Sequence, residues 1–146
     1  MKRDPALESL SHDHHHALFV AQKLRRATPD TAGAARDAFL EFWKTEGHGH
    51  FRVEEDVLLP AYADHGDVHH PLVAQSLCEH VEIRNLAARV SGDPDTSPET
   101  LNDLGRRLAD HVRLEERQLF PMIEEALPPH ALSALATALA AAERHV

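Results

Sequence analysis

The sequence predicts an all-α fold, an up-down antiparallel four-helix bundle with a short extra C-terminal helix. Apolar residues recur at three- and four-residue spacings over long segments, and Gly and Pro divide the chain into pieces of helical length. No segment shows the alternation of apolar and polar residues that is typical of a strand. Because long helices joined by short connections favour antiparallel neighbours, the pieces are expected to form one up-down bundle.

The length of 146 residues predicts a single domain over residues 1–146, large enough for one sizeable hydrophobic core. Within it, the bundle is expected over about 5–127 and the C-terminal helix over about 130–146.

The first two helices are bounded by a cap and a turn. Asp4 followed by Pro5 is typical of an N-cap and a first helical position, so the first helix is expected to begin there. The turn Thr28–Asp30 ends it, and the second helix is expected over about 31–64. Pro60 lies inside the second helix and is expected to kink it rather than end it, because the residues that follow keep a helical pattern.

The remaining helices begin at prolines. Pro71 follows the loop HGDVHH and opens the third helix, which is expected to stop before Ser91. Ser97 is expected to cap the fourth helix, with Pro98 at its first position. The Ala-rich C-terminal helix carries an apolar stripe, which is expected to pack on the bundle, with self-association as the alternative. The stripe consists of Leu132, Leu135 and Leu139.

Charge, hydropathy and cysteine content argue against several classes of protein. The net charge of −9 and the absence of a basic patch argue against a nucleic-acid partner. No apolar run reaches the length of a membrane span, and the first residues lack the apolar core of a signal peptide, so no membrane association is expected. The single cysteine, Cys78, cannot form an internal disulfide, which predicts a reducing, cytoplasmic location.

One pattern of eleven residues occurs twice, as HFRVEEDVLLP from His50 and as HVRLEERQLFP from His111. In each copy the His and the first Glu are four residues apart, and residues at that spacing share one face of a helix. His50 and Glu54 are therefore expected to project together, as are His111 and Glu115.

A histidine on the core-facing stripe of the preceding helix comes before each copy: His14 in the first half of the chain and His80 in the second. The order His, then His-x-x-x-Glu, thus recurs in both halves. The second Glu of each copy, Glu55 or Glu116, is rotated by about 100° from the first and is expected to be solvated.

Six residues of the two halves fall on faces that are expected to be buried. A buried carboxylate must be paired, neutralised or bound to a metal, because unpaired burial costs several kcal/mol. No Lys or Arg lies on the stripe beside Glu54 or Glu115. Each His or His–Glu pair alone is more simply explained as a hydrogen-bonded core or surface group. Together they favour two divalent cations held by four imidazoles and two bridging carboxylates. The six are His14, His50, Glu54, His80, His111 and Glu115.

Two further residues, Glu46 and His48, lie close to His50 in the sequence. Glu46 lies one turn before His50 on the same face and is expected either to support the site or to act as a substitute ligand. His48 lies between two glycines and is expected at the boundary of the core, where a role near the site stays open.

These motifs resemble the hemerythrin-like family, whose domain is also called the HHE cation-binding domain. The resemblance covers about Leu7 to Leu127 and implies a four-helix bundle around two non-haem irons, bridged by two carboxylates and a solvent-derived oxo or hydroxo group. Imidazole and carboxylate ligands suit iron, with manganese or zinc as alternatives. The residues that carry the resemblance, and that it implies as metal ligands, are His14 in DHHHAL, His50 and Glu54 in HFRVEEDVLLP, His80 in EHVEI, and His111 and Glu115 in HVRLEERQLFP.

Two departures from the oxygen-carrying hemerythrins bear on function. The carriers have a second His one turn after the third-helix ligand, where this chain has Arg84, and their last-helix carboxylate is an Asp five residues after the His, where this chain has Glu115 at four. The resemblance therefore implies binding of, or reaction with, oxygen, peroxide or nitric oxide, in iron or redox sensing or detoxification rather than bulk oxygen transport. An oxidase or catalase-like enzyme and a sensor without turnover both stay open.

The alternative function is a metal-stabilised protein-interaction module without turnover. Such a module would act through a separate protein partner, and removal of the metal would leave that partner bound. The chain is expected to be a monomer or a weak homodimer. A ferritin-like store is disfavoured, because ferritin-like bundles use Glu-x-x-His rather than His-x-x-x-Glu.

Overall fold

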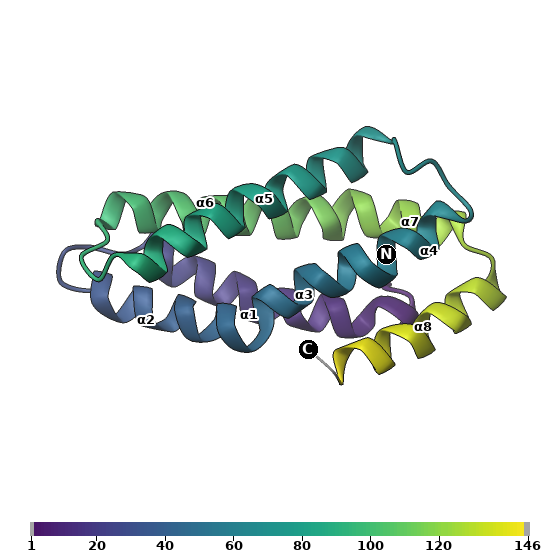
Figure 1. Cartoon of the computed structure of the whole chain (residues 1–146), viewed down its shortest axis with the longest axis horizontal. Coiled ribbons are helices and arrows are strands. Elements are labelled where there is room, and N and C mark those ends of the chain that lie inside the picture. The colour runs from purple at the N-terminus through teal and green to yellow at the C-terminus, as the bar shows by residue number, and fades with distance from the viewer. Residues whose placement is uncertain (1, 145–146) are drawn as a thin grey trace.

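The computed structural model describes residues 2–144 and confirms the predicted all-α bundle. Four long helical rods lie side by side, and α8 runs back along one side of them, against η1, α3 and η3 (Figure 1). In chain order, the elements are η1 (Pro5–Leu7), α1 (Glu8–Arg25), α2 (Ala32–Phe42), η2 (Trp43–Gly47), α3 (His48–Val53), η3 (Glu54–Leu58), α4 (Leu59–Ala63), α5 (Pro71–Gly92), α6 (Pro98–Leu114), η4 (Glu115–Leu119), α7 (Phe120–Ala126) and α8 (Pro129–Glu143).

The rods form a closed ring of neighbours. The first rod, α1, packs on both α2 and α6, and α5 in turn packs on α6 and α2. The second rod runs without a loop from α2 to α4, and the fourth runs from α6 to α7. Within the described residues, no helix combines the length and the apolar character that a membrane span requires.

The helix starts follow the sequence signals. Asp4 caps η1 by accepting a hydrogen bond from the Ala6 amide at 2.9 Å, and Ser97 caps α6 through the Thr100 amide at 3.2 Å. The His70 ring caps α5, because its Nδ1 accepts from the Leu72 amide. The predicted stop of the third helix before Ser91 is wrong: α5 continues through Gly92.

Two apolar clusters fill the core, one toward each end of the bundle. Each predicted ligand histidine lies, along its own helix, between residues of one cluster and residues of the other. Most apolar residues on the inner faces of the rods are buried, whereas Leu77 of α5 is exposed. Leu135 and Leu139 of α8 are buried in the apolar cluster that contains Leu10 and Phe120. This confirms that α8 packs on its own bundle.

Each copy of the repeated pattern contains a π-helical turn that begins at its first Glu. The amide of Leu59 bonds back to the carbonyl of Glu54, and the amide of Phe120 bonds back to that of Glu115. Proline two residues after each π-turn lacks an amide hydrogen, and its ring crowds the carbonyl four residues before it. A π-turn relieves that conflict within a continuous helix, so Pro60 does not end the second rod.

Gly105 permits a close approach of α6 to α1. A Cβ atom at this position would lie 2.7 Å from the carbonyl oxygen of Ala21 and 2.8 Å from Cβ of Leu24. Since both neighbours belong to the helix backbone or its first side-chain atom, neither can move without shifting α1. The two rods that carry His14 and His111 are therefore held at a separation that only Gly allows.

We predict that Gly105→Ala lowers the free energy of unfolding by about 1–3 kcal/mol, because the added methyl overpacks this contact. Gly33→Ala is the matched control, since a Cβ at Gly33 meets nothing within 4 Å. That variant should leave stability unchanged or raise it by up to about 1 kcal/mol through helix propensity. Urea unfolding of both variants checks this, and a Gly105→Ala protein as stable as the parent would contradict it.

Candidate metal centre

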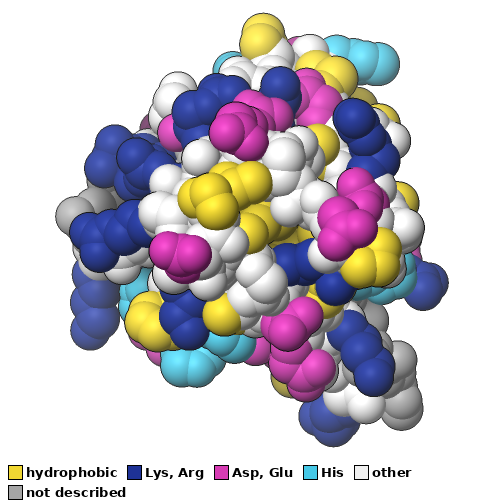
Figure 2. All heavy atoms as spheres, turned by 90° about the vertical axis from the view of Figure 1, so that its left-hand side faces the viewer, with side chains coloured by type: hydrophobic (Ala, Val, Ile, Leu, Met, Phe, Trp, Pro, Cys, Tyr) yellow, Lys and Arg dark blue, Asp and Glu magenta, His cyan; other side chains and the backbone are white. Residues whose placement is uncertain are grey.

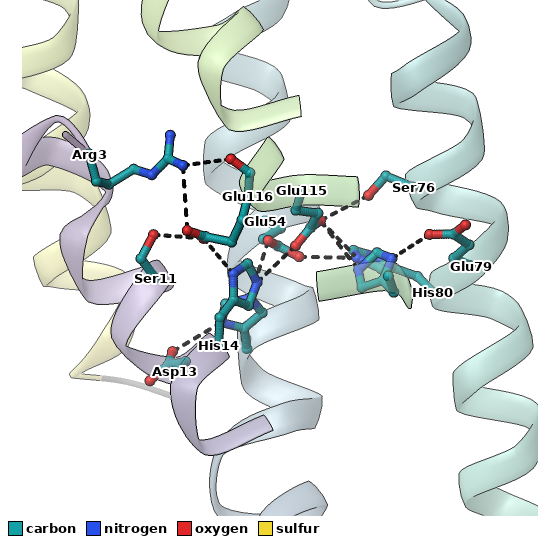
Figure 3. Close-up of polar contacts among 12 residues, drawn as sticks. Arg3, Ser11, Asp13, His14, Glu54, Ser76, Glu79, His80, Glu115 and Glu116 are labelled. Atoms are coloured by element: carbon teal, nitrogen blue, oxygen red, sulfur yellow. Dashed lines mark hydrogen bonds and ion pairs between the residues drawn. The ribbon is translucent and has the colours of Figure 1, made fainter. Parts of the chain in front are cut away.

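The bundle brings all six predicted residues together in one buried layer. Four rods contribute: α1 provides a His, α5 provides a His, and each remaining rod provides a His followed by the Glu that opens its π-turn (Figure 3). None of the six is more than 7% exposed, and both carboxylates are only 1% exposed. They are His14, His50, Glu54, His80, His111 and Glu115.

The six residues form two overlapping sets, each with two imidazoles and two carboxylates. In one set, His14 and His50 meet the two Glu side chains, and in the other set His80 and His111 meet the same two. Within each set, one ligand atom from every residue lies within 4.8 Å of the others. Glu54 and Glu115 belong to both sets, so each carboxylate lies within reach of both pairs of histidines.

Several atoms that face the centre of the layer lack hydrogen-bond partners, whereas Nε2 of His14 lies 3.0 Å from Glu115 and Ser76 donates to Glu115 at 2.9 Å. Glu54 lies 3.2 Å from Nε2 of His50 and 3.0 Å from Nε2 of His80, yet neither pair has hydrogen-bond geometry. Nε2 of His111 is also buried without a partner. Each such group costs about 1–3 kcal/mol. Buried nitrogen and oxygen atoms that converge without satisfying each other fit a divalent cation as their common partner.

Each of the four rings is held from its other side by a carboxylate. Nδ1 of His14 lies 2.7 Å from a carboxylate oxygen of Glu116, and Nδ1 of His80 lies 2.6 Å from one of Glu55. The other two contacts are His50 Nδ1 to Asp13 at 3.0 Å and His111 Nδ1 to Glu79 at 2.8 Å. With its Nδ1 held by a carboxylate, each ring turns Nε2 toward the centre, where the deprotonated nitrogen would be oriented to bind a metal.

The prediction that Glu55 and Glu116 are solvated is wrong. Both are half-buried, and each extends to a histidine on a neighbouring helix. The helical rotation angle places a side chain relative to its own axis and does not indicate what the adjacent rod offers within reach. A usable signal was present, because each of the four carboxylates is adjacent in sequence to a predicted ligand. The pairs are Asp13–His14, Glu54–Glu55, Glu79–His80 and Glu115–Glu116.

The two halves of the site are related by the duplication, and they differ in their outer contacts. Arg84 pairs with Glu55 at 2.8 Å and lies over the Phe51 ring, so it turns away from the centre. On the other side, Arg3 bonds the backbone and side chain of Glu116 (Figure 3). Phe51 stacks on His80 with ring centroids 3.9 Å apart. The rings are thus fixed by packing as well as by hydrogen bonds.

The buried carboxylates control the protonation of the rings. Burial alone would lower the pKa of His80, but Glu115 and Glu54 outweigh it and raise that pKa to about 9. The same opposition of burial and carboxylates raises the pKa of His111 to about 10, and those of His14 and His50 also rise. Although burial favours its neutral form, Glu115 has a pKa well below its usual range because His111 and other rings face it.

Glu46 and His48 lie outside both ligand sets. Glu46 contacts Nδ1 of His16 rather than the buried layer. His48 is exposed, with its ring edge-on to Trp43. Neither therefore acts as a substitute ligand in this arrangement, although Glu46 lines a crevice beside the layer.

The fold and the site together define a class: a helical bundle with a buried His/Glu cluster that is compatible with metal binding. The model of the hemerythrin HHE cation-binding domain matches residues 6–123, so the chain belongs to that family. No curated protein and no solved structure matches the chain.

We predict that the metal-free protein loses stability as the pH rises from about 7 to 10. The folded-state pKa values of the histidines lie above the unfolded value of about 6.5, so their stabilisation is complete below that pH and disappears as pH passes 9–10. The free energy of unfolding in urea should fall by a few kcal/mol over this range. His111→Gln should show a smaller fall, and a flat profile in the parent protein would contradict the prediction.

Proposed function

We propose that the chain is a non-haem di-iron protein in which each iron is held by two imidazoles and both iron ions are bridged by two carboxylates. The observation that carries this proposal is the pair of ligand sets that share both Glu side chains. The unpartnered buried atoms support it, because two cations would satisfy them together. The proposed ligands are His14, His50, Glu54, His80, His111 and Glu115.

The donor set of imidazoles and carboxylates fits iron, with manganese and zinc as alternatives. Imidazole and carboxylate ligands suit iron, manganese and zinc, whereas the absence of Cys from both sets argues against a site built for soft metals. Four protein ligands per metal leave positions for an exogenous ligand on an ion that prefers higher coordination. Bound iron supplies one-electron chemistry toward oxygen, peroxide or nitric oxide.

The residues of the chain prepare the site for that chemistry. The four carboxylates on Nδ1 fix the tautomer and the orientation of each ring. Phe51 and Phe120 stack on His80 and His14 and keep water from these rings. Arg84 pairs with Glu55 and leaves the second set with two imidazoles. We therefore place the function in sensing or detoxification of oxygen, peroxide or nitric oxide rather than in bulk oxygen transport.

The first test is iron content per chain, together with the optical spectrum of the reduced protein before and after exposure to air. Two irons per chain and an absorption of an oxidised di-iron centre that develops in air are expected. Peroxide turnover and nitric oxide binding then separate an enzyme from a sensor. A chain that takes up no metal, or one ion with no spectral change, would contradict the proposal.

Glu54→Ala is predicted to lose at least one metal per chain, because it removes a ligand from both sets at once. The matched control is Glu41→Ala, since Glu41 is exposed on α2 in the same rod. Elemental analysis of the two purified variants makes the comparison. Full metal content in Glu54→Ala would show that Glu54 is not a metal ligand.

Glu79→Ala is predicted to weaken metal binding by about 10- to 100-fold, because His111 loses the acceptor that orients its ring. Glu79→Gln keeps an oxygen acceptor and should lose less. Glu82→Ala on the exposed side of the same helix is the control, because Glu82 pairs with Arg107 and not with a ligand. Competition against a chelator of known affinity measures the three dissociation constants. Equal affinities in Glu79→Ala and Glu82→Ala would show that Glu79 does not position the ring.

A further inference from the structure

One surface cleft lies beside the first ligand set, where α1, η2, α3 and the end of α8 meet. Asp13 of α1, Glu46 of η2 and Glu143 of α8 contribute carboxylates to its wall, and none of the described residues that line it is Lys or Arg. A hydrogen bond of 2.7 Å from Ser9 to Glu143 joins α1 to α8 at its rim. Three different elements thus place negative charge around one opening.

Other clefts on the described part of the molecule differ in charge. One is lined by Lys44 and Arg52, and another by Arg89 and Arg107, in each case beside carboxylates. The end of the bundle with the α1–α2 and α5–α6 connections likewise mixes basic and acidic side chains across its surface (Figure 2). The cleft bordered by Glu143 is therefore distinguished by carboxylates without Lys or Arg among its described lining residues, although His12 and His50 also line it.

The acidic cleft continues toward the buried layer. Asp13, Glu46 and His50 line both the cleft and a narrow inner crevice, and that crevice also reaches His14 and His111. His50 is 7% exposed, and its buried Nε2 has no hydrogen-bond partner. His50 thus lines the cleft and also carries a buried nitrogen that lacks a hydrogen-bond partner.

The outer sides of the site carry different charges. Glu55 is covered by Arg84 and Glu116 by Arg3, so a cation that approached there would meet a guanidinium. Phe51 also stacks on His80 on the Arg84 side. By contrast, neither Asp13 nor Glu79 pairs with a Lys or Arg within residues 2–144, and Asp13, which holds the His50 ring, lies in the wall of the cleft.

We propose that the acidic cleft is the route by which a divalent metal ion reaches the buried cluster. This inference rests on the proposed function, because it assumes that the cluster takes up metal. Converging carboxylates in a concave wall attract a cation and raise its local concentration, which accelerates association without requiring a second stable site. Asp13 then leads the ion to His50, whose ring it holds.

The test measures Co²⁺ uptake by the metal-free full-length chain in a stopped-flow instrument, followed by visible absorption of the bound ion. The double variant Glu46→Gln/Glu143→Gln should bind Co²⁺ about 3- to 10-fold more slowly at low ionic strength. The difference should vanish at about 1 M salt, where the screening length is only about 3 Å. The double variant Glu41→Gln/Glu125→Gln removes the same charge from exposed positions outside the cleft and should match the parent rate.

A steric variant tests the route independently of charge. Thr45→Trp places a bulky neutral side chain on the cleft wall and should slow Co²⁺ association and chelator-driven release by the same factor, with unchanged affinity. Equal uptake rates in the two charge variants, or unaltered rates in Thr45→Trp, would overturn the route while leaving the metal site intact. A parent chain that binds no Co²⁺ would overturn the metal site and the route with it.

Discussion

The burial of two glutamates between two apolar clusters is the constraint on which the rest of the structure depends. Glu54 and Glu115 are each 1% exposed, and no Lys or Arg in the described residues pairs with them. Ionised carboxylates in such a place are tolerated only with nearby positive charge and hydrogen bonds. The four histidines provide the positive charge when the cluster holds protons, and two cations would provide it when the cluster holds metal.

Charge balance links these two states. The cluster and its surrounding ring contain six carboxylates, and Arg3 and Arg84 compensate two of them. The carboxylates raise the pKa of every ring, which favours protonated imidazoles that offset the remaining negative charge when no metal is bound. Two divalent cations would carry the same charge as four protons. Metal uptake would therefore release protons from the rings, because metal binding requires deprotonated imidazoles.

Duplication explains why the site can be symmetric although the chain is asymmetric. In each half, the acid before the first His holds the ring of the second, and the acid after the Glu holds a ring of the opposite half. The π-turn and the proline that follows it recur at the same place in both halves. What differs is outside this layer: Arg84 closes one side, while α8 and its carboxylate border an acidic cleft on the other.

The sequence by itself determined the helical bundle, the duplicated eleven-residue pattern, and the six residues that meet at the centre of the bundle, whereas the π-turns within the repeats became visible only in the structure. These follow from periodicity along a helix, which is a local property that a sequence displays directly. The tertiary structure decided what each side chain meets on a neighbouring rod. Glu55, Glu116, Asp13 and Glu79 hold the rings only because the rods pack at a particular rotation and separation, to which Gly105 contributes. The acidic cleft likewise exists only where α8 returns to the bundle, because its three carboxylates come from distant parts of the chain.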